Sequence, residues 1–204
     1  FCNNFKNKSL LFNMNLNNIK DNNGLPLFSK IEIKSIEKNT NQIINDLNKN
    51  FEKLEKNMIT EKSNFYNLSI YEREKIEYDL GFYWGVISHL SSVKNNDELR
   101  ISYENAMPKV IEISNKISQS KNLYDCLEKS LEHDKLNSVQ KRILKKEING
   151  MKLNGVNLNE SDQKKFRKIS TRLAELSNNF RNNVLDSIKN YEMVIEDDFH
   201  MKEM

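Results

Sequence analysis

Apolar residues recur at steps of three and four along most of the chain, which is the spacing that gathers side chains on one face of an α-helix. This pattern predicts a first helix that begins near Ile36 and a second that runs from about Ser69 to Val93. The apolar face of the first helix is formed by Ile43, Ile44, Leu47, Phe51, Leu54 and Met58. Such faces indicate amphipathic helices that pack on a common core.

A third helix is predicted after the polar break at residues 95–97, with Asp97 as its N-cap because a short acceptor side chain can take up a free backbone N–H. Pro108 should kink or restart this helix, since proline removes a donor and clashes with the preceding turn. Two shorter helices follow, over about 123–131 and 139–148.

The clearest helical pattern comes last, after a loop that we expect at Asn149–Gly150 and Asn154–Gly155. Its start is signalled by Asn159 and by the negative charge that follows in the first turn. Its apolar positions are Phe166, Ile169, Leu173, Leu176, Phe180, Val184, Leu185 and Ile188.

The two ends of the chain differ from this helical middle. We expect residues 1–24 to form a flexible tail, in which Met14 could be the true start, and residues 25–190 to form one helical domain. Residues 191–204 would begin a truncated following segment. Their alternating pattern could open a strand whose partner is outside the chain, with apolar positions at Tyr191, Met193 and Ile195.

Composition supports an all-α fold and excludes two classes of partner. Five glycines and two prolines in 204 residues are few for a sheet-rich protein with many turns. Acidic and basic residues alternate along the chain, 29 against 32, which argues against nucleic-acid binding. The chain has no apolar run of the roughly 18 residues that a membrane span requires, so we expect no membrane partner.

The residues that usually carry chemistry form no recognisable motif. The three histidines, His89, His133 and His200, are far apart, and the spacing of four that places two imidazoles on one helix face is absent. We interpret His89, five residues after Trp84, as a packing residue. The two cysteines, Cys2 and Cys126, are expected to be reduced thiols. The polar residues Glu98, Arg100, Tyr103 and Glu104 are interpreted as caps or surface contacts. We therefore predict no catalytic, cofactor-binding or metal-binding residue.

Four blocks of sequence nevertheless resemble one family. The longest runs from Trp84 to Arg100 (Trp-Gly-Val-Ile-Ser-His-Leu, then Val-Lys-Asn and Glu-Leu-Arg) and continues in register with Tyr103, Glu104 and Pro108. The others span residues 25–31 (Leu-Pro-Leu-Phe-Ser-Lys-Ile), 153–158 and 172–186. In this order and spacing they are similar to the N-terminal part of oligopeptidase A, in the thimet oligopeptidase family of zinc metallopeptidases.

The resemblance, which covers about residues 25–195, implies a function that this chain cannot perform alone. Family members are longer, almost wholly helical and two-lobed, and a deep channel admits short peptides. Their His-Glu-x-x-His motif and third zinc ligand lie beyond this segment. The full-length protein is thus expected to be a cytoplasmic Zn²⁺ endopeptidase whose missing C-terminal catalytic lobe is the partner of this chain, and the chain alone should be inactive and bind no cofactor.

An isolated N-terminal lobe should also expose the apolar faces that normally meet the catalytic lobe. An alternative function remains open: a stand-alone helical remnant that acts, if at all, as a peptide- or protein-binding module.

Overall fold

The computed structural model describes residues 16–94 and 96–194, and in these ranges the regular structure is helical, as the sequence predicts. Three short 3₁₀ helices come first, η1 (Leu16–Ile19), η2 (Phe28–Lys30) and η3 (Ile33–Ser35). A π-helical turn, η4 (Asn67–Glu72), leads directly into the second long helix. The α-helices are α1 (Ile36–Thr60), α2 (Arg73–Val93), α3 (Asp97–Ser118), α4 (Lys121–His133), α5 (Ser138–Leu153) and α6 (Glu160–Lys189).

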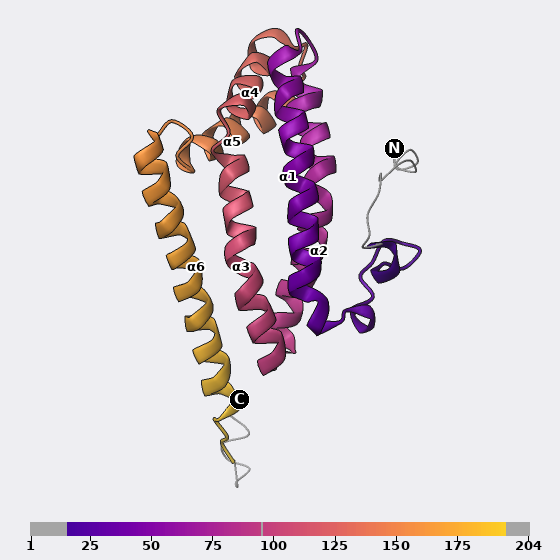
Figure 1. Ribbon diagram of the computed structural model, residues 1–204, viewed down its shortest axis with the longest axis vertical. Helices are drawn as coiled ribbons and strands as arrows, with labels where there is room; N and C mark the ends of the chain where they lie inside the picture. The colour runs from indigo at the N-terminus through magenta and orange to yellow at the C-terminus, as the bar shows by residue number, and fades with distance from the viewer. Residues whose placement is uncertain (1–15, 95, 195–204) are drawn as a thin grey trace, which may run out of the picture.

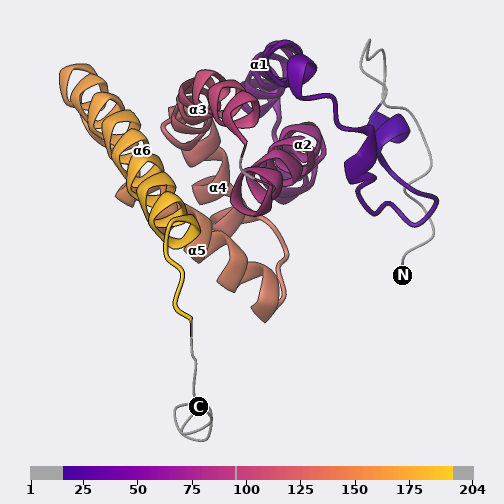
Figure 2. The same cartoon turned by 90° about the horizontal axis from the view of Figure 1, so that it is seen from below.

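The long helices lie side by side, and the two shorter ones cover one end of the bundle (Figure 1). α1 packs against α2 and α3, while α4 packs against α5 and the last turns of α1. α6 runs along α3 on the side away from α1, as the end-on view shows (Figure 2). α3 is therefore the central helix, with the core on one side and α6 on the other.

The core forms where the spacing of apolar residues predicts it. The apolar face of α1 is buried at Ile43, Leu47, Phe51, Leu54 and Met58. The polar residues between them face outward, so that α1 satisfies the amphipathic pattern along its whole length. None of the described helices is long and apolar enough to cross a membrane.

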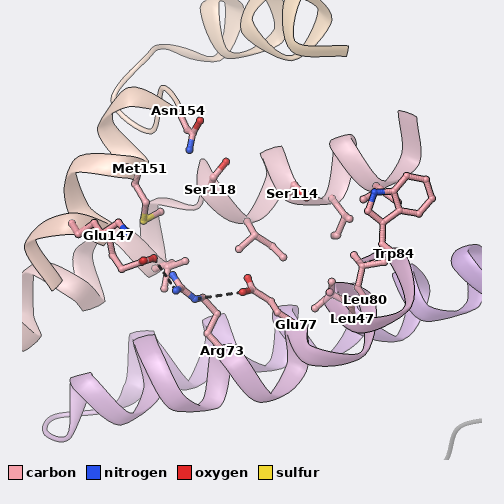
Figure 3. A pocket seen from close by; sticks show the side chains of 17 residues that line it. Leu47, Arg73, Glu77, Leu80, Trp84, Ser114, Ser118, Glu147, Met151 and Asn154 are labelled. Atoms are coloured by element: carbon pink, nitrogen blue, oxygen red, sulfur yellow. Dashed lines mark hydrogen bonds and ion pairs between the residues drawn. The ribbon is translucent and has the colours of Figure 1, made fainter. Parts of the chain in front are cut away.

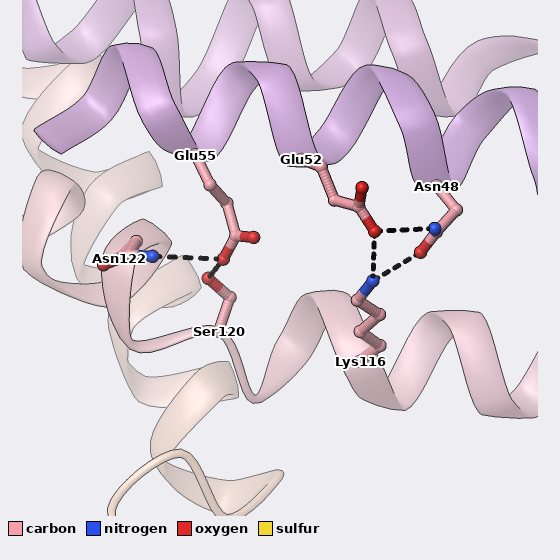
Figure 4. A network of polar contacts seen from close by, with 6 residues as sticks. All are labelled: Asn48, Glu52, Glu55, Lys116, Ser120 and Asn122. Atoms are coloured by element: carbon pink, nitrogen blue, oxygen red, sulfur yellow. Dashed lines mark hydrogen bonds and ion pairs between the residues drawn. The ribbon is translucent and has the colours of Figure 1, made fainter.

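Polar contacts fix the position of α1 relative to α3 and α4 (Figure 4). Lys116 Nζ donates to Asn48 and lies 3.2 Å from Glu52 Oε1, and its ammonium holds the pKa of the Glu52 carboxyl below its usual value. One turn further along α1, Glu55 accepts a hydrogen bond of 2.5 Å from the hydroxyl of Ser120. Ser120 is also the N-cap of α4, so this contact ties the start of α4 to α1.

One detail of α3 differs from the prediction. The N-cap is Asn96, whose side chain accepts from the backbone N–H of Leu99, so the assignment to Asp97 was wrong by one residue. Of the two alternatives predicted at Pro108, a kink or a restart, the restart does not occur, because α3 continues through this residue. The buried side chains of Met107 and Val110 on either side pack into the core, and this packing outweighs the hydrogen bond that proline cannot donate.

The loop predicted at Asn149–Gly150 is wrong, because α5 continues to Leu153. Met151 is buried and extends the apolar face of the helix by one more turn, which outweighs the weak helix propensity of Asn and Gly. The turn lies at Asn154–Gly155, where Gly155 has a φ of +83° that other residues rarely adopt.

The start of α6 is as predicted, and the two ends of the chain are described only in part. Asn159 caps α6 by accepting from the backbone N–H of Asp162. In the segment expected to be a tail, η1 buries Leu16 and Ile19, and Lys20 pairs with Pro26 in an isolated β-bridge. Residues 191–194 have no regular structure, while Met14 and the rest of the strand expected after Asn190 lie outside the described residues.

Phe51 provides a test of this core because its side chain is fully buried in the middle of α1. We expect Phe51→Ala to lower the free energy of unfolding by about 3–5 kcal/mol, since it removes a large apolar side chain and leaves a cavity. Urea denaturation followed by circular dichroism measures this loss. The control is Ile59→Ala on the same helix, where the side chain is exposed. An equal loss in both variants would contradict the assigned orientation of α1.

Candidate interaction surface on helix α6

α6 turns its polar side inward. The only two of its residues that are fully buried are asparagines, Asn178 and Asn182. Six of the eight residues of its predicted apolar face are exposed instead, while Phe166 and Leu185 are half-buried. We call the following residues, which are between 41% and 71% exposed, the α6 stripe: Ile169, Leu173, Leu176, Phe180, Val184 and Ile188.

Helix geometry explains why both sets cannot face α3 at once. At 3.6 residues per turn, Phe180 lies about 160° around the helix axis from Asn178. The two asparagines are four residues apart and share one face, whereas the stripe occupies the opposite face. Whatever holds the asparagines against α3 therefore also holds the stripe in solvent.

A carboxylate of α3 holds both asparagines. Glu104 Oε1 accepts a hydrogen bond of 3.0 Å from the side-chain amide of Asn178 and another of 3.0 Å from that of Asn182. Hydrogen bonds to an ionised acceptor are about twice as strong as those between neutral groups. One side chain of α3 thus fixes the rotation of α6 about its axis.

Arg181 extends this contact to α2. Its guanidinium donates to Asn178 and to the hydroxyl of the buried Ser91 on α2, at 3.2 Å. The same group lies 5.2 Å from the ring centroid of Tyr103, a cation–π distance. Tyr103 in turn stacks on Trp84 with centroids 4.7 Å apart. Arg181, Tyr103 and Trp84 therefore form one continuous stack across three helices.

An ion pair closes the arrangement near the end of α6. Arg100 at the start of α3 donates two hydrogen bonds to the carboxylate of Asp186, at 2.8 and 2.5 Å. This guanidinium lowers the pKa of the Asp186 carboxyl below its ordinary value. We call the contacts that Asn178, Arg181, Asn182 and Asp186 of α6 make with α2 and α3 the α6 seam.

The residues that could carry catalysis or bind a metal do not come together. His89 lies beside Phe28, with ring centroids 5.4 Å apart, and His133 lies 6.3 Å from Phe65. His200 and Cys2 are outside the described residues. Burial raises the pKa of the Cys126 thiol to about 11, which leaves it protonated and a poor nucleophile at neutral pH. In residues 16–94 and 96–194, no three His, Cys, Asp or Glu side chains could hold a metal.

Comparison with known proteins agrees with this architecture. The family model for the N-terminal domain of neurolysin and thimet oligopeptidase matches residues 40–164, which is more than half of the chain. The chain belongs to this family. It is 33% identical over 178 residues to oligopeptidase A of Haemophilus influenzae, covering 86% of the chain and 26% of that protein.

Other proteins named oligopeptidase A also match this chain over part of their length. The chain is 30% identical over 185 residues to oligopeptidase A of Escherichia coli, with 88% of the chain and 26% of that protein covered. It is 33% identical over 127 residues to the organellar oligopeptidase A of Arabidopsis thaliana. This match covers 61% of the chain and 16% of that protein. The chain thus spans about a quarter of the length of the two bacterial relatives, and it matches the N-terminal domain of the family.

The α6 seam unites two of the blocks that carry the resemblance to the oligopeptidase family. Arg100, Tyr103 and Glu104 come from the longest block, and their partners on α6 come from the block at 172–186. From the sequence alone, Arg100 and Glu104 are interpreted as caps or surface contacts, and their partners on α6 are not identified. A signal was present: Asn178, Asn182 and Asp186 recur every four residues on the face opposite the apolar one.

Glu104→Ala tests whether the seam holds α6. We expect hydrogen exchange of the amides around 174–186 to accelerate about tenfold or more, because two charge-assisted hydrogen bonds are lost. Mass spectrometry of the exchanged protein measures this rate. Glu112→Ala, which removes an exposed carboxylate about two turns further along α3, is the control and should leave the exchange unchanged. Equal effects of the two substitutions would refute the role of Glu104.

The ion pair between Asp186 and Arg100 should make the stability of α6 depend on pH. The pKa of Asp186 is lower in the folded protein than in the unfolded chain, so its contribution to stability is present above the unfolded pKa and disappears as the pH falls through the folded pKa. We expect the exchange protection of residues 180–189 to weaken on acidification below about pH 4. In Asp186→Asn this part of the pH dependence should vanish. An unaltered acid profile in the variant would assign it to other carboxyls.

Proposed function

We propose that this chain is the N-terminal, non-catalytic part of an oligopeptidase A-like zinc metalloendopeptidase that hydrolyses short peptides in the cytoplasm. The observation that carries the proposal is the α6 stripe, six apolar side chains held in solvent by a polar seam on the other side of the helix. The match to about a quarter of the length of oligopeptidases A supports it.

In this proposal the stripe is the surface on which the catalytic lobe docks. Exposed apolar patches of several hundred Å² on a protein mark interaction sites. The stripe follows most of α6, from Ile169 to Ile188, which at 1.5 Å per residue is a length of roughly 28 Å. A partner lobe that covers the stripe would complete the wall of a channel that admits short peptides and excludes folded proteins.

Zinc belongs to the full-length enzyme in this proposal and not to this chain. The described residues offer no group of three or more His, Cys, Asp or Glu side chains in metal-binding proximity, so the donor set does not fit the ion. The zinc ligands and the water-activating group would come from the catalytic lobe. The chain contributes shape and a docking surface, and no step of peptide hydrolysis is assigned to its residues.

The same exposed stripe supports a second function, that of a stand-alone helical module which binds peptides or another protein. An amphipathic helix of a partner could lie along α6 without any catalytic lobe. The two functions differ in what they require: the enzyme needs a zinc-bearing lobe, whereas the module binds its partner alone.

A chimera separates the two functions. The chain replaces the matching N-terminal part of Escherichia coli oligopeptidase A, and hydrolysis of a fluorescence-quenched short peptide is measured. We expect the chimera to cleave the peptide and Leu173→Ser/Phe180→Ser in the stripe to reduce this activity at least tenfold, since loss of each apolar contact costs about 1–3 kcal/mol of docking energy. The chain alone should bind no stoichiometric zinc and show no turnover.

The control chimera carries Ile101→Ser/Val139→Ser, which removes two exposed apolar side chains outside the stripe. It should retain full activity. If all chimeras are inactive although folded and zinc-loaded, the chain is not an equivalent N-terminal domain and the enzyme proposal fails. Loss of activity in both double variants would refute the role of the stripe.

A further inference from the structure

A groove of about 510 Å³ lies between α2 and α3 and is closed at one end by α5 (Figure 3). This volume is within the range of about 300–1,000 Å³ found for small-molecule sites. Most of its lining is apolar and includes Leu80, Val110, Ile113 and Met151. The groove contains no residue of the α6 stripe, and it meets the stack described above only at Trp84.

Charged side chains occupy the end of the groove near α5. Arg73 Nη2 donates to Glu147 Oε2 at 2.8 Å, while Arg73 Nε lies 3.7 Å from Glu77 Oε2, too far for a hydrogen bond. The guanidinium is thus engaged by Glu147. The carboxylate of Glu77, whose side chain is 36% exposed, points into the groove beside it. It is paired with this guanidinium at 3.7 Å but accepts no hydrogen bond from the described residues (Figure 3).

The electrostatic environment of Glu77 is negative. Burial raises the pKa of its carboxyl, Arg73 partly opposes this effect, and the charges of Glu147 and Glu74 raise the pKa further. Lys146 also lines the groove but is exposed. Two carboxylates, those of Glu77 and Glu147, therefore face the guanidinium of Arg73 at this end, and an additional cation would be attracted there.

Two glycines enlarge the groove at the expense of helix stability. Gly81 in α2 and Gly150 in α5 both line it, and a Cβ placed on either would meet nothing within 4 Å. Glycine inside a helix costs roughly 0.5–1 kcal/mol relative to alanine, and no neighbouring atom in the protein requires it at these positions. The space over both residues is thus available to a ligand.

An aromatic ring lies toward the other end of the groove. Trp84 is the single tryptophan of the chain, and it lines the groove while one of its faces stacks on Tyr103. The ring offers apolar contact to the body of a ligand whose charged end is at Glu77. It also supplies a fluorescence signal that reports directly on occupancy.

We propose that this groove binds a primary ammonium group attached to an apolar body, with the ammonium at Glu77 and the body along Leu80, Val110 and Ile113 toward Trp84. An ammonium carries three donors on a compact charge and can donate to a carboxylate whose paired guanidinium lies too far away for a hydrogen bond. Both a free arylalkylamine and the amino end of an apolar peptide have this chemistry. The site does not depend on the proposed function, because the ligand binds whether or not the full-length protein cleaves peptides.

The test is a fluorescence titration of the purified chain with 2-phenylethylamine and with Phe-Leu-Ala amide. We expect a saturable change in Trp84 emission with both probes. The neutral isostere 2-phenylethanol and the N-acetylated peptide should bind at least tenfold more weakly, because neither presents an ammonium. If one of the two cationic probes alone binds, that result identifies the source of the ammonium. If the neutral analogues bind as well as the amines, or no probe binds saturably, the proposal is overturned.

Matched variants locate the site. Glu77→Gln keeps the shape of the side chain and should weaken binding of both amines at least tenfold. It is expected to fold, since burial already disfavours the ionised carboxyl at this position. Gly81→Leu should block the groove, whereas Gly85→Leu, at a helical glycine that also has open space but does not line the groove, should bind normally. Unchanged affinity in a folded Glu77→Gln protein would refute the assignment.

Discussion

The structure depends on one interaction, the acceptance of two asparagine side chains of α6 by the carboxylate of Glu104 on α3. This contact fixes which face of α6 meets the bundle. Its energetic consequence is large, because burial of an apolar side chain of this size is worth about 1.5–3 kcal/mol and six such side chains remain in solvent. The hydrogen bonds of the α6 seam, worth about 1–3 kcal/mol each, are of the same order and oppose that loss. In the proposed function, a second surface covers the stripe and supplies the burial that α6 lacks here.

Most helices follow from local rules, and the exceptions show where packing overrides them. The apolar spacing along α1 predicts both the helix and its buried face, and Asn159 predicts the start of α6. Asn149–Gly150 looked like a loop because both residues are weak helix formers. The helix nevertheless continues through them, because burial of Met151 stabilises its last turn. Pro108 is tolerated for the same reason, since its neighbours Met107 and Val110 are anchored in the core.

The candidate interaction surface could be predicted only in part. Periodicity identified the apolar face of α6, but the same pattern arises whether that face meets the core of the domain or a separate partner. The orientation is decided by contacts between residues 74 to 86 positions apart, such as Glu104 with Asn178 and Arg100 with Asp186. Pairs so distant leave no trace in a local pattern, and for that reason Glu104 was interpreted as a surface residue.

The groove and the seam are physically connected through α3. Trp84 lines the groove and stacks on Tyr103. The guanidinium of Arg181 on α6 lies over the ring of Tyr103. A ligand beside Trp84 would therefore contact the end of a stack that reaches α6. Adjacency alone does not couple two sites, because a ligand shifts an equilibrium only by its difference in affinity for two states. Coupling of the groove to the α6 stripe would therefore require a ligand that prefers a second position of Tyr103.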